Sequence, residues 1–401
     1  MKVLQINSVC GFGSTGRIAV DLCRMLEKHA DECCVAFGRG NAPRDIQTYK
    51  IGTNRDVLVH GGLSRLTDRH GFYSKSVTRK FVVWMKAYDP DVIILHNLHG
   101  YYIHVGVLFE ALREMDKPVI WTLHDCWPFT GHCVHFEYFG CNKWKEQCKK
   151  CGQKRTYPAS ILIDNSKKNQ EDKRYLFNLV QHMNIVTPSL WLANLVTESF
   201  LKSYSVFVIP NGIDLNIFRP TDSNLRKVYD INEKRVVLGV ANVWSKKKGL
   251  DDFVKLSELL GRDYRIVLIG LKKKQLKFTE SGMTGLLRTD SVEQLAQWYS
   301  LADVYVNATY EDNFPTTNIE ALACGTPVIT YDTGGSAESI TNSCGRIVRQ
   351  GNVEELAEAI KEYASHEKDK RACVMRAQKY NKDVQFEMYY ELIQGLREVC
   401  E

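Results

Sequence analysis

Residues 304–331 read VYVNATYEDNFPTTNIEALACGTPVITY, and this stretch determines the predicted fold. Val304–Asn307 and Val328–Tyr331 are short apolar runs with the length and composition of buried strands. Between them, Asn318–Cys324 carries apolar residues at helical spacing. A strand, a helix and a second strand in this order predict a βαβ unit with parallel strands.

The same alternation of short strands and helices runs through the whole chain. The further expected strands are Val3–Asn7, Cys33–Phe37, Val92–His96, Val119–His124, Asn184–Thr187, a run that starts at Val206, Val236–Ala241 and Arg265–Ile269. The further expected helices are Arg17–Lys28, a helix capped by Ser189, Leu250–Leu260, Val292–Ser300, Val353–Ser365 and Phe386–Val399. At 401 residues the chain has room for two domains. The sequence therefore predicts an α/β protein with two Rossmann-like, doubly wound parallel sheets.

The composition is that of an ordinary globular protein, with 44% hydrophobic and 25% charged residues. The sequence does not open with the pattern of a secretory signal, and no window has the length and apolarity of a membrane span. We therefore expect a cytoplasmic protein whose 13 cysteines are reduced thiols, metal ligands or core side chains.

The net charge of +6 is concentrated in one segment, residues 141–175. This segment holds ten Lys or Arg residues against four acids, an excess equal to the charge of the whole chain. It is either a solvated basic face or a surface for anionic lipid headgroups, which would make the protein peripheral at the inner face of the membrane, or for a pyrophosphate-bearing acceptor. No nucleic-acid-binding motif accompanies it, so nucleic acid is not an expected partner.

Two acids, Asp312 and Glu320, stand eight residues apart in the stretch quoted first. Asp312 lies in the loop after a strand, and Glu320 lies on the following helix, which is expected to begin near Pro315 or Thr316. The free N–H groups at the start of that helix favour a diphosphate. Each carboxylate can accept hydrogen bonds from a pair of vicinal hydroxyls. The pattern therefore indicates an elongated, polar, phosphorylated ligand.

The stretch 311–327 resembles the acidic pair of the retaining glycosyltransferases of family 4, which have the two-domain GT-B fold with a cleft between the domains. The resemblance implies that Glu320 holds the ribose of a nucleotide and that the first acid orients the donor sugar. Relatives have Glu at the first position, whereas this chain has Asp312 preceded by Glu311, so either carboxylate is a candidate. The resemblance also implies donor binding by Asn313, Phe314, Pro315 and Thr316.

Three further stretches match the same family. Val208–Pro220 resembles its interdomain segment and places Asn211 at the mouth of the cleft. Lys248, in the Lys-Gly-x-Asp step, matches the lysine that neutralises the donor diphosphate, but Val243 stands where relatives usually have an arginine. The glycine-rich stretch 330–338 resembles a step that shapes the loop beside the nucleotide.

In the N-terminal half, a glycine-rich loop follows the first strand, at the edge where open α/β sheets bind ligands. A dinucleotide fingerprint is not met, because no acid ends a second strand about twenty residues later. In the family this loop lies near the diphosphate and the acceptor, which makes Gly13, Ser14, Gly16 and Arg17 donor-binding candidates. His124, at the end of another strand, matches the histidine that meets the donor sugar and is a catalytic candidate with Glu311, Asp312 and Glu320.

A cysteine-rich insert, residues 126–155, interrupts the N-terminal domain. The two-residue gap between Cys148 and Cys151 lets both thiolates reach one zinc ion. Cys133 and Cys141 would complete a tetrahedral structural site, with His132 or His135 as substitute ligands; reduced thiols or a disulfide are the alternatives. We expect the insert to shape the acceptor side.

The resemblance implies an N-terminal domain over 1–205, a nucleotide-sugar domain over 206–380 and a C-terminal helix, 381–401, that packs back on the first domain. It implies transfer of a sugar from a UDP- or GDP-linked donor to an acceptor hydroxyl, with no cofactor required for catalysis. The expected acceptor is a sugar or a lipid-linked oligosaccharide of a bacterial surface polysaccharide. The alternatives are a sugar-nucleotide epimerase of the same fold and a non-catalytic sugar-nucleotide-binding protein.

Overall fold

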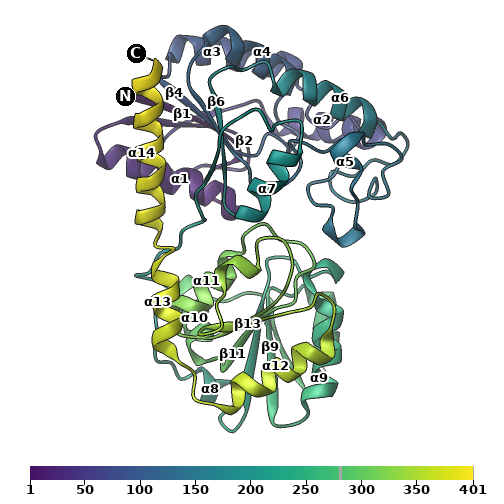
Figure 1. Ribbon diagram of the computed structural model, residues 1–401, viewed down its shortest axis with the longest axis vertical. Coiled ribbons are helices and arrows are strands. Elements are labelled where there is room, and N and C mark those ends of the chain that lie inside the picture. The colour runs from purple at the N-terminus through teal and green to yellow at the C-terminus, as the bar shows by residue number, and fades with distance from the viewer. Residues whose placement is uncertain (280–281, 401) are drawn as a thin grey trace. The chain divides into compact units, whose positions relative to one another are not determined.

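The computed structural model describes residues 1–279 and 282–400 and places every predicted strand in one of two parallel sheets (Figure 1). The chain divides into two compact units. Unit 1 contains Met1–Ile209 and the C-terminal stretch from Phe386, and unit 2 contains Pro210–Gln385. Residue 401 of the predicted C-terminal helix lies outside the described residues. Within the described part of the chain, no helix is both long enough and apolar enough to cross a bilayer.

Unit 1 is built on a seven-stranded parallel sheet in the order β3-β2-β1-β4-β5-β6-β7. The strands are β1 (Lys2–Val9), β2 (Glu32–Arg39), β3 (Gln47–Lys50), β4 (Val92–Leu95), β5 (Val119–Thr122), β6 (Met183–Thr187) and β7 (Val206–Val208). Because β7 pairs with β6, unit 1 continues to Ile209, past the boundary predicted at residue 205.

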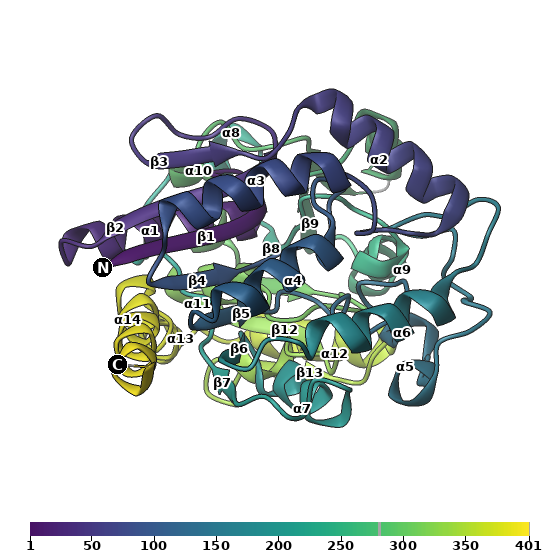
Figure 2. The ribbon, with the colours of Figure 1, turned by 90° about the horizontal axis from the view of Figure 1, so that it is seen from above.

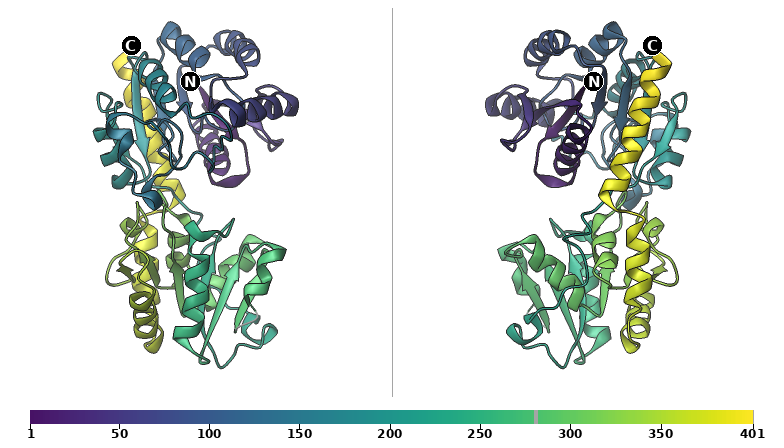
Figure 3. Two further views of the ribbon diagram at one scale, coloured as in Figure 1. Left: turned by 90° about the vertical axis from the view of Figure 1, so that its right-hand side faces the viewer. Right: turned by 90° about the vertical axis from the view of Figure 1, so that its left-hand side faces the viewer.

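Helices cover both faces of this sheet (Figures 2 and 3). The helices of unit 1 are α1 (Gly13–Lys28), α2 (Asn54–Thr67), α3 (Lys75–Tyr88), α4 (Val105–Met115), α6 (Ser166–Phe177) and α7 (Leu190–Glu198), with the short α5 (Lys143–Glu146) in the insert and the part of α14 (Lys382–Cys400) from Phe386 onward. Successive strand residues point to opposite faces, so Leu4 and Ile6 of β1 pack with α3, α4, α6 and α7. Val3 packs on the other face with α1 and with Phe386 and Ile393 of α14.

Unit 2 has a six-stranded parallel sheet in the order β10-β9-β8-β11-β12-β13. The strands are β8 (Arg235–Val240), β9 (Tyr264–Ile269), β10 (Met283–Leu286), β11 (Val304–Asn307), β12 (Val328–Tyr331) and β13 (Gly345–Val348). The helices are α8 (Leu225–Val228), α9 (Leu250–Leu260), α10 (Val292–Leu301), α11 (Thr316–Ala323), α12 (Val353–Ser365) and α13 (Lys370–Gln378). One face packs against α10, α11 and α13, and the other against α9 and α12.

Both sheets have a point where the strand order reverses, between β1 and β4 in unit 1 and between β8 and β11 in unit 2. Loops at the carboxyl ends of strands beside such a point diverge and leave room for a ligand. The predicted fold class is confirmed: each unit is a doubly wound, Rossmann-like parallel sheet. The predicted site residues are therefore expected to lie at these two reversal points.

Candidate functional site

In unit 2, two lysine–carboxylate pairs join the loop after β8 to the loop after β11. Lys248 Nζ lies 2.6 Å from Asp312 Oδ2, and Lys247 Nζ lies 2.5 Å from Glu311 Oε1. The Glu311 side chain is 8% exposed and the Asp312 side chain 23% exposed. Glu311 is thus the buried acid of the two, and Asp312 with Lys248 is the pair that a ligand can reach.

The close approach of these two loops depends on Gly249, directly after the 3-10 turn Lys246–Lys248. Gly249 has φ +71°, and a Cβ atom there would lie 2.2 Å from the carbonyl oxygen of Ala308. A side chain at this position would therefore push the loops apart. The Tyr310 N–H donates to the Lys247 carbonyl at 2.8 Å and fixes the same contact. The glycine that follows Lys248 is thus required for the two loops to approach each other.

Glu320 lies on α11 and is held by a residue that the sequence analysis missed. The Tyr299 hydroxyl, from α10, donates to Glu320 Oε2 at 2.9 Å. Burial, together with the nearby Glu320 charge, raises the pKa of Tyr299 well above its ordinary value, so the hydroxyl keeps its proton. No signal in the sequence links these two residues, because their contact arises only when α10 packs beside α11.

The start of α11 presents backbone donors rather than side chains. Pro315 is its N-cap, and no described side chain caps the helix. The Asn211 side-chain amide donates to the Phe314 carbonyl at 3.2 Å and so joins the segment after β7 to this loop. Phe314 itself is in the hydrophobic core, with its ring 5.5 Å from that of Tyr380. Because the Phe314 side chain is buried in the core, only its backbone groups can contact a donor, as predicted for this residue.

The remaining predicted residues of unit 2 lie around the same edge of the sheet. Asn313 is buried, and Thr316, the first residue of α11, is half-buried. Val243, at the position usually held by an arginine, is half exposed and brings no charge. Lys246 lies 3.9 Å from Asp251 and Lys247 is paired with Glu311, so Lys248 is the lysine of this run that pairs with Asp312.

In unit 1, the glycine-rich loop forms the start of α1. The helix begins at Gly13, earlier than the predicted Arg17, and no described side chain caps it. The Gly11 N–H donates to the Gly16 carbonyl at 3.0 Å, which closes the loop into a tight turn. Gly13, Ser14 and Arg17 are exposed, whereas Gly16 is buried against Val9 and Gly11. The exposed residues are free to meet a ligand, and Gly16 permits the turn.

His124 lies at the carboxyl end of β5, in a network of histidines. His96 Nδ1 lies 3.1 Å from His124 Nε2, and His96 Nε2 lies 2.9 Å from Gln5 Oε1. Burial lowers the pKa of His124 to about 4 and that of His96 well below its ordinary value. Both rings are therefore neutral near pH 7 and act as hydrogen-bonding groups.

A second group beside this network was not predicted. His99 Nε2 lies 2.6 Å from Asp125 Oδ2, and His99 Nδ1 lies 3.0 Å from the Tyr157 hydroxyl. Burial acts to raise the pKa of Asp125, but the charge and hydrogen bond of His99 lower it below its ordinary value, so the carboxyl stays ionised. The two histidines in residues 96–99, directly after an apolar strand, were the signal in the sequence that pointed here.

The cysteine-rich insert has some features of a thiolate site. Cys133 is within electrostatic reach of Cys141, Cys148 and Cys151, and the Gly131 N–H donates to Cys148 Sγ at 3.3 Å. However, among residues 1–279 and 282–400, no three His, Cys, Asp or Glu side chains converge as ligands of one metal ion. The twelve cysteines with described side chains form no disulfide. As placed, the thiols do not form a metal centre, and the zinc site stays a prediction.

Comparisons with known proteins agree with this arrangement. The family model "Glycosyltransferase Family 4" matches residues 15–217, and the model "Glycosyl transferases group 1" matches residues 221–380. The chain is 24% identical to the Escherichia coli glycosyl transferase WcaC, whose name assigns it to colanic acid biosynthesis, over 90% of each chain.

Two further comparisons cover a partial match and a solved structure. The chain is 30% identical over 176 residues, 40% of its own length and 45% of the relative's, to an N,N'-diacetylbacillosaminyl-diphospho-undecaprenol α-1,3-N-acetylgalactosaminyltransferase of Campylobacter jejuni. The structure of Anabaena HepE in complex with UDP-glucose superposes with a TM-score of 0.66 at 15% identity, over 98% of this chain and 100% of the other.

We predict that acidification destabilises unit 1 more than unit 2. The pKa of His60 is lowered to about 3 and that of His124 to about 4, and those of His70 and His96 are also lowered, in each case chiefly by burial. The unfolded chain therefore binds more protons below about pH 6.5, and the stability present above that pH is lost as the pH falls toward 4.

Calorimetric scans between pH 7 and pH 5 measure this effect. The transition of unit 1 should move down by roughly 8 °C or more, because these histidines together cost on the order of 4–8 kcal/mol at pH 5. Unit 2 is the internal control, since His366 is its only histidine and is exposed. Equal shifts of the two transitions would contradict the neutral histidine network.

Proposed function

Because the chain belongs to glycosyltransferase family 4, we propose that it transfers a sugar from a nucleoside-diphosphate sugar to an acceptor hydroxyl with retention of anomeric configuration. The observation that carries the proposal is the grouping of Lys248, Asp312 and Glu320 at the reversal point of the unit 2 sheet. One cation, two acids and a helix start match the three parts of such a donor: diphosphate, sugar and ribose.

Each residue has a distinct role in the proposal. Lys248 and the N–H groups at the start of α11 balance the charge that develops on the departing diphosphate. Glu320, oriented by Tyr299, accepts hydrogen bonds from the ribose hydroxyls. Asp312 accepts hydrogen bonds from the donor sugar, and neutral His124 bonds a sugar hydroxyl. The HepE complex with UDP-glucose supports a uridine nucleotide, with a guanosine nucleotide as the alternative.

The proposed acceptor is a lipid-linked oligosaccharide of surface polysaccharide biosynthesis. WcaC supports the polysaccharide pathway by its name, and the Campylobacter enzyme is named for a diphospho-undecaprenol acceptor. With a lipid-borne acceptor the proposed reaction takes place at a membrane surface, and we propose the inner face expected from the sequence. The transfer step itself is proposed to need no metal, as the family resemblance implies, and a zinc ion would be structural.

We predict that Glu320→Gln and Lys248→Met each lower kcat/KM by about 100-fold or more, because each removes a charge that binds the donor in the transition state. A panel of UDP- and GDP-sugars, screened first by thermal shift and then by turnover, identifies the donor for the assay. NMR of the product gives the anomeric configuration. Glu358→Gln, at an exposed acid of α12, is the matched control and should keep full activity.

Each outcome of this assay has a clear meaning. An inverted product would contradict retention. Isomerisation of the donor without an acceptor would favour the epimerase alternative, and binding without turnover would favour a silent binding protein.

We predict that substitutions of Glu311 and Asp312 have different effects on activity and stability. Asp312→Asn is expected to lower kcat by about 10- to 100-fold with little change in Tm, because this partly exposed carboxylate is proposed to bind the donor sugar. Glu311→Gln is expected to lower the free energy of unfolding by about 1–3 kcal/mol, because Lys247 loses a buried partner. Kinetics and thermal melts of both variants measure this. The reverse pattern would assign the donor sugar to Glu311.

Zinc in the insert is tested by metal analysis of protein purified without chelator. The proposal predicts about one zinc per chain, lost in the Cys148→Ser/Cys151→Ser variant because tetrahedral sites need all four ligands. Cys373→Ser, a buried cysteine of unit 2, is the matched control. Only trace zinc in the unmodified protein would contradict the proposal.

A further inference from the structure

The helix α2 turns its apolar side chains outward. Leu58 is 75% exposed, Val59 61%, Leu66 46% and Leu63 38%, whereas its buried residues are the polar His60 and Ser64. A helix on the surface of a globular protein normally buries the apolar face and exposes the polar one. α2 therefore presents an apolar surface that nothing in the described part of the chain covers.

Polar contacts hold α2 in this orientation. The His60 ring bonds on both sides, through Nδ1 to the Ser74 hydroxyl at 2.9 Å and through Nε2 from the Gly71 N–H at 3.3 Å. At the start of the helix, Thr53 and Asp56 form a reciprocal capping box. The helix is thus fixed without burying its leucines, whose exposure is a property of the folded protein.

A second apolar segment lies beside the end of α2. Ile161, Leu162 and Ile163 are 62%, 66% and 47% exposed. The Ile161 N–H donates to the Arg65 carbonyl at 2.7 Å, and the Ser160 hydroxyl donates to the Ile163 carbonyl at 2.7 Å. The two segments therefore form one surface, here called the apolar patch: Leu58, Val59, Leu63, Leu66, Ile161, Leu162 and Ile163.

The rim of the apolar patch is basic. Residues 54–67 and 154–163 contain four basic residues, Arg55, Arg65, Lys154 and Arg155, and one acid, Asp56. Asp56 accepts hydrogen bonds from the Thr53 N–H and hydroxyl in the capping box. The Lys154 ammonium group donates to the Leu162 carbonyl at 3.4 Å, so it stands directly beside the apolar side chains. The rim therefore attracts anions.

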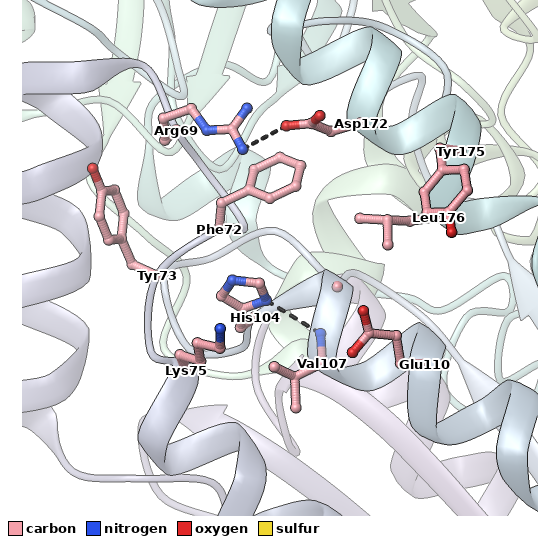
Figure 4. A pocket seen from close by; sticks show the side chains of 11 residues that line it. Arg69, Phe72, Tyr73, Lys75, His104, Val107, Glu110, Asp172, Tyr175 and Leu176 are labelled. Carbon is pink, nitrogen blue, oxygen red and sulfur yellow. Dashed lines mark hydrogen bonds and ion pairs between the residues drawn. The ribbon is translucent and has the colours of Figure 1, made fainter.

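The nearby pocket does not supply this positive charge (Figure 4). It has a volume of about 330 Å³ and is lined by residues of the segment after α2 and by α4 and α6, including Arg69, His104 and Asp172. Arg69 is paired with Asp172 at 2.6 Å and lies over the Phe72 ring at 3.9 Å. The pocket lining holds two basic residues, Arg69 and Lys75, and two acids, Glu110 and Asp172, so the anion preference of this face comes from the rim of the apolar patch.

We propose that the apolar patch is a docking surface for an anionic lipid bilayer, with its leucines and isoleucines entering the headgroup region and its arginines meeting lipid phosphates. Apolar side chains flanked by arginine and lysine are what such an interface binds. Pairing with a second copy is disfavoured, because a two-fold contact would bring Arg55, Arg65 and Arg155 against the same charges of the partner. The location differs from the basic segment 141–175 and shares only residues 154–163 with it.

The apolar patch would bring the protein to the membrane that carries the proposed acceptor. This biological role rests on the proposed function, whereas the binding of the patch to lipid does not. Binding of the full chain to vesicles is measured without donor or acceptor. Vesicles of phosphatidylcholine mixed with phosphatidylglycerol should bind the protein, and vesicles of phosphatidylcholine alone should bind it at least about tenfold less well. Raising the salt concentration should weaken binding to the mixed vesicles.

Two sets of variants test the apolar patch itself. Leu63→Gln/Leu66→Gln and Ile161→Gln/Leu162→Gln should each lower the partition onto mixed vesicles by about tenfold or more. Arg55→Glu/Arg65→Glu should do the same and remove the preference for anionic lipid. Val228→Gln/Met375→Gln, at exposed apolar positions of unit 2, is the matched control and should bind as the parent does.

The outcomes separate the surface from the transfer reaction. Unchanged vesicle binding in the apolar patch variants, with folding confirmed by melting, would overturn the proposal. A stable dimer in light scattering that these variants dissociate would overturn it in favour of a second copy. Nucleotide affinity by calorimetry should be equal in all variants. If no donor were turned over at all, the proposed function would be wrong. Binding of the protein to vesicles would still test the proposed docking surface independently.

Discussion

The parallel direction of every strand in both sheets is the constraint on which the candidate site depends. Each crossover helix returns the chain to the edge where the strands begin, so all strands end at the opposite edge and the loops at their carboxyl ends gather there. Lys248 and Asp312 are 64 residues apart in the chain, and they form an ion pair because β8 and β11 are neighbours in the sheet. The charge pattern of the site thus follows from the topology.

The fold could be predicted largely because buried parallel strands are short apolar runs between helices. The edge strands β3 (QTYK), β10 (MTGL) and β13 (GRIV) were missed because partly exposed strands at a sheet edge lack that apolar signal. In the site, the residue types and spacings of Glu320, Asp312 and Lys248 were readable from the sequence. The contact from Tyr299 and the burial of Phe314 were not, because both depend on how α10, α11 and the core pack.

The two units differ in the electrostatic character of their candidate residues. Unit 2 holds its acids as ion pairs and hydrogen-bonded carboxylates, whereas the network at the unit 1 edge consists of neutral histidines. A histidine with a pKa of about 4 is a weak base at neutral pH and suits a hydrogen bond to a sugar hydroxyl better than proton abstraction. This character agrees with the proposed role of His124, which is to bond a sugar hydroxyl and not to remove a proton.

The helix α2 shows why periodicity alone did not indicate its role. No helix was predicted over Asn54–Thr67, and the hydrophobic effect alone would bury Leu58, Leu63 and Leu66. The structure turns them outward because His60 has hydrogen-bond partners on the inner side that a leucine would not satisfy. The preference of a buried polar group for its partners thus decides which face is exposed. The same preference that fixes the helix also leaves exposed the apolar patch that we propose as a membrane-docking surface.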